Sequence, residues 1–188
     1  QSLMEAIKTL GYAPSAVKHI LITHADLDHV GSLAGIAAAT GAEVHASATT
    51  RTHISNVTSP EHVPIAFLLS PVQKLMQKPA VVDHVFADDD VLDIAGGIRV
   101  VYCPGHTDEN YCFYWEGRGV LFAPDLLHRI PGRLTLTQPA ISWDTAAAKR
   151  SAIRTLELEP QIICVGHGDA LMGDALKREV EALRTAMR

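Results

Sequence analysis

The chain has 188 residues, of which 47% are hydrophobic, and a formal net charge of -5 at pH 7. This length is sufficient for one sizeable hydrophobic core, so we expect a single domain over residues 1–188. The acidic balance excludes a generic nucleic-acid binder, which would need a basic face. The sequence also has no run of the roughly 18 apolar residues that a membrane span requires.

The first part of the chain alternates helical and strand patterns. The expected elements are a helix over residues 3–10, a strand over 17–22, a helix over 29–40, a strand over 43–46 and a helix over 47–54. Residues 63–78 are apolar and are interrupted by Pro64 and Pro71. We interpret this stretch either as a lid or pocket wall or as a buried connecting helix.

From residue 81 onward the hydrophobic period changes to two, which is typical of strands. The expected elements are strands over residues 91–94, 97–103, 111–115 and 119–123, a helix over 145–158, a strand over 161–165 and a helix over 169–187. The interleaving of helices and strands predicts a layered α/β protein.

A short polar segment directly after the first strand has the composition of half a metal site. His24, Asp26, Asp28 and His29 place four potential ligands within six residues. In an extended chain the first three would point to one side and His29 elsewhere. Asp28 also lies at the start of a helical pattern, so an N-cap is its alternative role.

Three more candidate ligands follow later strands. His106, Asp125 and His167 each come just after a predicted strand. Because strand ends meet at one rim in layered α/β proteins, we expect these residues to converge with the first group. The remaining histidines lack such a pattern and are interpreted as surface or core residues: His19, His45, His53, His62 and His84.

These segments resemble the signature of the metallo-β-lactamase fold superfamily, His-x-His-x-Asp-His followed by a distant His, Asp and His. The resemblance implies an αββα sandwich of two mixed sheets with helices outside, and two divalent metal ions. It assigns His24, Asp26 and His106 to the first ion, Asp28, His29 and His167 to the second, and Asp125 to both. A hydroxide shared by the two cations would then attack a carbonyl or phosphoryl centre, with Asp28 and Asp125 as catalytic residues.

One position departs from the family pattern, because Asp26 stands where relatives usually have His. Two divalent cations would be balanced by three aspartates and one hydroxide, so the ligand shell is formally neutral rather than positive. Such a site should attract anionic substrates less. Zinc is the expected metal, with iron or manganese as alternatives because a carboxylate is a harder ligand than imidazole.

The resemblance implies a metal-dependent hydrolase that cleaves a small-molecule ester, lactone, thioester or amide. One alternative is a diiron-type oxidoreductase or dioxygenase on the same fold, and another is a non-catalytic metal-binding protein. His128, three residues after Asp125, is a candidate substrate contact, as are Phe67 and Leu68.

The three cysteines lie in apolar surroundings without framework spacing, which predicts free thiols and a cytoplasmic location. The family's opening strands have no counterpart before the first helix. We therefore expect an N-terminally incomplete domain, or a sheet edge completed by a second copy in a homodimer.

Overall fold

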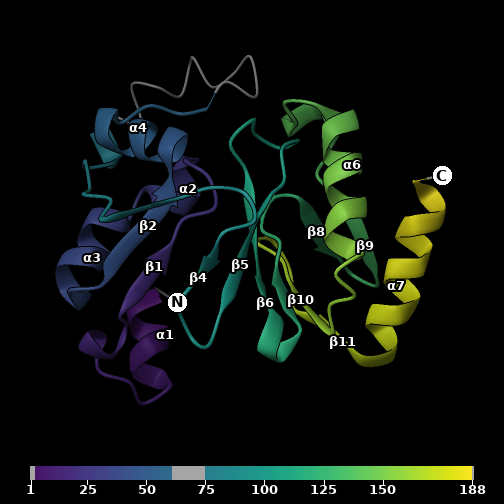
Figure 1. The fold of residues 1–188 in the computed structure, drawn as a ribbon, viewed down its shortest axis with the longest axis horizontal. Helices are drawn as coiled ribbons and strands as arrows, with labels where there is room; N and C mark the ends of the chain where they lie inside the picture. The colour runs from purple at the N-terminus through teal and green to yellow at the C-terminus, as the bar shows by residue number, and fades with distance from the viewer. Residues whose placement is uncertain (1–2, 61–74, 188) are drawn as a thin grey trace. The chain divides into compact units, whose positions relative to one another are not determined.

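The computed structural model describes residues 3–60 and 75–187, which fall into two compact units (Figure 1). Within the described residues, unit 1 comprises 3–60 and 75–86, and unit 2 comprises 87–187. The predicted substrate contacts Phe67 and Leu68, and most of the predicted lid over residues 63–78, lie outside the described residues. The mixed α/β class is confirmed, whereas one domain over residues 1–188 stays a prediction.

Unit 1 is built on a small parallel sheet with the strand order β1-β2-β3. Its elements are α1 (Leu3–Thr9), a 3-10 turn (Pro14–Ala16), β1 (His19–Leu21), α2 (Leu27–Val30), α3 (Leu33–Thr40), β2 (Glu43–Ser47), α4 (Ala48–Asn56) and β3 (His84–Phe86). Val44 and Ala46 of β2 are buried against Leu33 of α3 and Ile54 of α4. Helices α3 and α4 therefore cover one face of this sheet, on the left of Figure 1.

Local chemistry explains two of the boundaries in unit 1. The Ser47 hydroxyl accepts a hydrogen bond from the Thr50 amide at 3.1 Å and so caps the start of α4. The helix predicted over residues 29–40 is instead two helices, α2 and α3, separated by Gly31 and Ser32. The prediction failed there because the apolar pattern continues across the break.

Unit 2 contains a six-stranded sheet with the order β11-β10-β7-β6-β5-β4 and a separate hairpin, β8–β9. Its strands are β4 (Val91–Leu92), β5 (Ile98–Tyr102), β6 (Tyr111–Trp115), β7 (Val120–Phe122), β8 (Leu127–Ile130), β9 (Arg133–Leu136), β10 (Ile162–Cys164) and β11 (Leu171–Met172). The helices are α6 (Thr145–Leu156) and α7 (Gly173–Ala186), with 3-10 turns at Glu116–Arg118 and Pro139–Ile141. Buried Leu121 and Ile163 of the sheet join Ala152 of α6 and Leu183 of α7 in one core.

Several short strands of the structure were not predicted. The sequence pattern missed β3 and the β8–β9 hairpin, and it extended the last helix back to residue 169. Leu171 instead pairs with Ile163 in an antiparallel bridge, so α7 begins only at Gly173. A strand of two residues is too short to show a hydrophobic period, so the sequence pattern does not report it.

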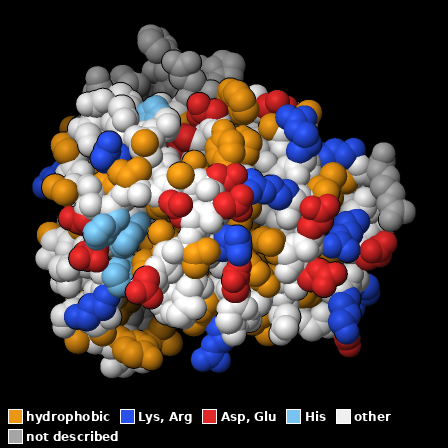
Figure 2. Space-filling view, in the orientation of Figure 1, with side chains coloured by type: hydrophobic (Ala, Val, Ile, Leu, Met, Phe, Trp, Pro, Cys, Tyr) orange, Lys and Arg blue, Asp and Glu red, His pale blue; other side chains and the backbone are white. Residues whose placement is uncertain are grey.

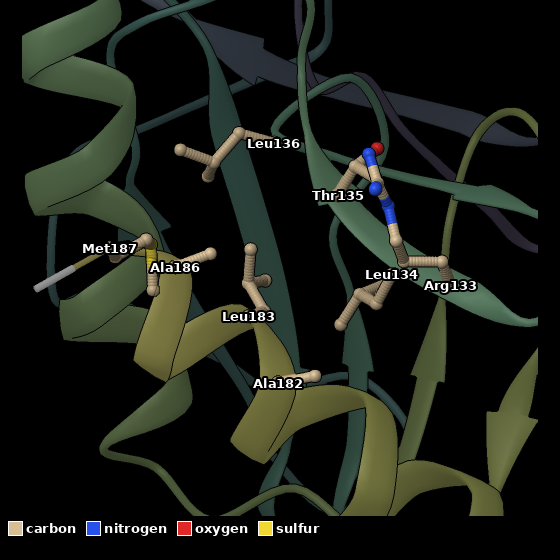
Figure 3. A pocket seen from close by; sticks show the side chains of 8 residues that line it. All are labelled: Arg133, Leu134, Thr135, Leu136, Ala182, Leu183, Ala186 and Met187. Atoms are coloured by element: carbon tan, nitrogen blue, oxygen red, sulfur yellow. The ribbon is translucent and has the colours of Figure 1, made fainter.

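A hollow of about 390 Å³ lies beside β9 and α7 in unit 2 (Figure 3). Its walls include Leu134 and Leu136 from the strand and Leu183 from the helix. None of the predicted ligands lines it. We therefore assign it no role in the chemistry.

None of the helices within residues 3–60 and 75–187 combines the length and the apolar character that crossing a membrane requires.

The Gly105→Ala substitution is expected to destabilise the fold by about 3 kcal/mol. Gly105 has φ +150°, and a Cβ added there would lie 2.5 Å from the Ala148 Cβ of α6. Gly35→Ala is the matched control, since an added Cβ at this α3 position meets no atom within 4 Å. Urea unfolding of both variants measures the difference, and equal stabilities would contradict the packing argument.

Candidate metal centre

The loop after β1 carries a buried histidine whose orientation is set by its neighbour. His24 has no exposed surface. Its Nδ1 lies 3.1 Å from the Thr23 hydroxyl, and its Nε2 lies 3.6 Å from Asp26 Oδ2. The hydroxyl contact to one ring nitrogen leaves the other directed at the carboxylate, an arrangement that is typical of metal-binding histidines.

Asp28 and His29 lie in the short helix α2 rather than in an extended chain. The expected alternation of His24, Asp26 and Asp28 along a strand is therefore wrong. Asp26 occupies the N-cap position of α2 without a side-chain capping bond, so the N-cap role suggested for Asp28 is also wrong. His29 Nε2 lies 3.6 Å from Asp28 Oδ2, and the rings of His29 and His24 are 4.1 Å apart. Unit 1 thus gathers all four predicted residues.

Unit 2 brings together the other three predicted ligands, with His106 and His167 on either side of Asp125. The Asp125 Oδ2 atom lies 3.4 Å from His106 Nε2 and 3.6 Å from His167 Nε2. His106 and Asp125 are buried, whereas the His167 side chain is about half exposed at 55%. Each of the three residues follows a strand end, namely those of β5, β7 and β10.

Supporting residues of this group were not identified from the sequence. The buried Thr137 hydroxyl lies 3.4 Å from His106 Nδ1. Gly166 lets the His167 loop approach Asp125, because a Cβ there would lie 2.7 Å from Asp125 Oδ1. The position of Thr137 depends on tertiary packing, and no local motif marks it.

The His167 loop is also attached to the β8–β9 hairpin and to α7. The Arg129 amide donates a hydrogen bond to the His167 carbonyl at 3.2 Å. The Arg129 guanidinium donates to both carboxylate oxygens of buried Glu179 on α7, at 3.2 and 3.3 Å. A bidentate contact of this kind fixes the orientation of the guanidinium relative to the carboxylate as well as their distance.

His128 lies beside the Asp125 group, as its sequence position suggested. Its ring centroid is 5.5 Å from that of His167. Its Nε2 is buried and makes no hydrogen bond within the described part of the chain. Burial lowers the pKa of His128, and the attraction of Asp125 opposes this shift, so the imidazole is neutral near pH 7.

The donor set fits a divalent transition metal. Ligand atoms about 2.0–2.1 Å from a tetrahedral zinc ion lie about 3.3 Å from one another. The imidazole–carboxylate separations of 3.4–3.6 Å within each unit are close to that spacing. They exceed the usual 2.7–3.2 Å of a hydrogen bond from nitrogen to oxygen. These nitrogen and oxygen atoms are therefore arranged more like ligands of a shared ion than like hydrogen-bonded pairs.

Known proteins resemble this chain in sequence and in fold. Hydroxyacylglutathione hydrolase from Rhodobacter capsulatus is 32% identical over 152 residues, which cover 79% of this chain and 47% of that protein. The chain thus spans about half the length of this curated relative.

Many solved structures match this chain, and two of them illustrate the similarity. A metallo-beta-lactamase family protein from Thermus thermophilus has a TM-score of 0.71 at 23% identity, over 98% of this chain and 65% of its own. TTHA1623, solved in a di-iron-bound form, has a TM-score of 0.66 at 25% identity, over 94% of this chain and 81% of its own.

The first structure demonstrates a shared fold. The sequence model of the metallo-beta-lactamase superfamily matches residues 1–167 of this chain. The fold of this family implies divalent metal ions, and the residues described above supply candidate ligands. The chain belongs to the metallo-beta-lactamase superfamily.

Proposed function

We propose that this chain is a metal-dependent hydrolase that uses two divalent ions to cleave a small-molecule thioester. The ligands would be His24, Asp26 and His106 for one ion, Asp28, His29 and His167 for the other, and Asp125 for both. The observation that carries the proposal is the ligand-like spacing of imidazole and carboxylate atoms in each unit. Family membership supports the combination of the two groups.

The reaction needs a nucleophilic water and a polarised carbonyl. Bound divalent ions supply both by lowering the pKa of water and by acting as Lewis acids. The water oxygen bonds to the carbonyl carbon, the C–S bond breaks, and the thiolate leaves and takes up a proton. Thr23 and Thr137 keep the Nε2 atoms of His24 and His106 available as ligands. The buried Nε2 of neutral His128 is suited to hydrogen-bond the substrate or to hold a proton.

Among esters, lactones, thioesters and amides, the thioester is favoured by the hydroxyacylglutathione hydrolase relative. A hydroxyacyl thioester of glutathione is therefore the first substrate to test. The neutral ligand shell created by Asp26 favours substrates whose reacting end carries little negative charge.

The decisive experiment is a turnover assay on the metal-depleted and the reconstituted chain. Hydroxyacylglutathione, a lactone, a β-lactam and a phosphoester are supplied separately, with zinc, iron or manganese added back. We expect thioester hydrolysis that is lost after chelation and restored by metal. Activity that is unaffected by thorough metal removal would refute the proposal.

Zinc stays the first choice of metal, and iron is the specific alternative. The di-iron-bound form of TTHA1623 and the carboxylate at Asp26 both favour a test with iron. The second candidate function is accordingly a diiron-type oxidoreductase or dioxygenase. Oxygen consumption by the iron-loaded chain with a thiol-containing substrate would favour it over hydrolysis.

Replacement of Thr137 by Val is expected to weaken metal binding by about 10–100-fold, because His106 Nδ1 loses its hydroxyl neighbour. Thr155→Val is the matched control. Its buried hydroxyl donates to carbonyl oxygens of its own helix, those of Ser151 and Ala152, and lies outside the metal-binding group. Competition with a coloured chelator measures both affinities, and equal losses would show that Thr137 has no specific role.

We also infer a cytoplasmic location and a homodimer. The three thiols are free, with Cys103 and Cys112 buried and Cys164 half-buried, which favours a reducing compartment. β1 is an edge strand of its sheet within the described residues, and a second copy could pair with it. Light scattering at several concentrations tests the dimer.

A further inference from the structure

Three histidines and a glutamate gather on one face of the unit 1 sheet, and none of them is among the ligands discussed above. Parallel pairing places His19 of β1 opposite Glu43 of β2, and His45 of β2 opposite His84 of β3. Because side chains alternate along a strand, Glu43 and His45 emerge on the same face. Figure 2 shows histidine side chains grouped beside acidic ones over this part of the molecule.

The nitrogen and oxygen atoms of this group are as close to one another as the ligand atoms around a bound metal ion. His19 Nδ1 lies 3.1 Å from His45 Nε2 and 3.6 Å from Glu43 Oε2. One ligand atom from each of these three residues lies within 4.8 Å of the other two. The 3.1 Å contact is within hydrogen-bond range, and the distances of 3.1 and 3.6 Å lie on either side of the separation of about 3.3 Å between two ligand atoms of a tetrahedral zinc ion.

Burial and packing hold the group in place. His45 is only 7% exposed, and its ring stacks on that of His84 with centroids 4.6 Å apart and an interplanar angle of 23°. His84 Nε2 lies 3.3 Å from the same Glu43 oxygen that faces His19. His84 is thus placed to orient the carboxylate, as residues around a metal ligand commonly do.

We propose that His19, Glu43 and His45 form a second, separate site for one divalent ion of the zinc class. Two imidazoles and one carboxylate provide three protein ligands, and the partial exposure of His19 and Glu43 leaves room for water in the fourth position. His19 lies at the start of β1 and His45 pairs with Leu21 at its end, whereas the proposed catalytic ligands of unit 1 begin at His24, so the two groups share no residue. The role of this second site is to bind β1 to β2, which stabilises the edge of the sheet.

Zinc binding to the complete 188-residue chain tests the proposal. Titration calorimetry with Zn²⁺ on His19→Gln and Glu43→Gln should reveal one equivalent fewer than in the wild type, or that equivalent weakened about 100-fold or more. His53→Gln removes an imidazole of the same unit outside the group and should keep the wild-type count. Circular dichroism verifies that each variant is folded. The exposed position of Glu43 makes Glu43→Gln the safer substitution.

Imidazole NMR identifies the residues that bind. During the same titration the ring nitrogens of His19 and His45 should shift in the wild type and stay unchanged in Glu43→Gln. Equal zinc counts with equal affinities in the wild type and both cluster variants would overturn the proposal, as would loss of the same equivalent in His53→Gln. If the proposed dinuclear centre does not exist, the wild type and all three variants lack the same zinc equivalents. The difference in zinc binding between the two cluster variants and the other two proteins would remain.

Discussion

Replacing Asp125 by Asn is expected to lower kcat/KM for thioester hydrolysis by about 1,000-fold or more. Asp125 has imidazole nitrogens of His106 and His167 at 3.4 and 3.6 Å, and it is the residue proposed to bridge both ions. An amide has no negative charge to hold two cations. Loss of roughly 4 kcal/mol of Lewis-acid stabilisation corresponds to that factor.

Steady-state kinetics and metal analysis are measured together on this variant. Asp93→Asn makes the same chemical change at an exposed carboxylate of unit 2, and it should keep both the activity and the metal content. Wild-type turnover in Asp125→Asn would rule out the dinuclear mechanism.

The Asp26→His substitution is expected to retain metal and to improve the use of anionic substrates by about tenfold relative to neutral ones. The Asp26 carboxylate lies 3.6 Å from His24 Nε2, so a substituent there acts directly on the ligand group. Replacement by imidazole raises the formal charge of the ligand shell from zero to +1. A tenfold change corresponds to about 1.4 kcal/mol of differential attraction.

The measurement is the ratio of kcat/KM values for two thioesters that differ only in one remote carboxylate. Repeating it at high salt serves as an internal control, since screening should reduce the gain. Asp26→Asn removes the charge without adding an imidazole, and it separates the charge effect from the change of ligand. A ratio that stays the same in both variants would refute the electrostatic explanation.

Sequence patterns identified the elements that carry their own local signal. The apolar run over residues 111–115, followed by a turn signal, predicted β6 with its observed bounds, because a strand inside a sheet carries apolar side chains on both faces. Helix α6 was also anticipated, and Asp144 caps it by accepting hydrogen bonds from the amides of Ala146 and Ala147. The two-residue strand β11 had no such signal, since its pairing partner β10 determines it.

In the candidate site, too, the sequence predicted what has a local signal and missed what depends on residues distant in sequence. The dense group from His24 to His29 was visible as potential ligands, because imidazoles and carboxylates so close in sequence are close in space whatever the fold. Their conformation was mispredicted, since residues 27–30 form a helical turn instead of an extended chain. Thr137 next to His106 was not found, because no sequence spacing connects a threonine with a histidine 31 residues away.

By itself, the sequence determined the α/β class, the superfamily resemblance and the identity of the seven candidate ligands. Those properties depend on local periodicity and on short motifs. Only the tertiary structure decided which ring nitrogens face a carboxylate and which residues support them. It also brought together His19, Glu43 and His45. The sequence had indicated these two histidines only as surface or core residues. The physical reason is strand register: pairing between distant segments determines which side chains become neighbours, and local sequence does not encode that pairing.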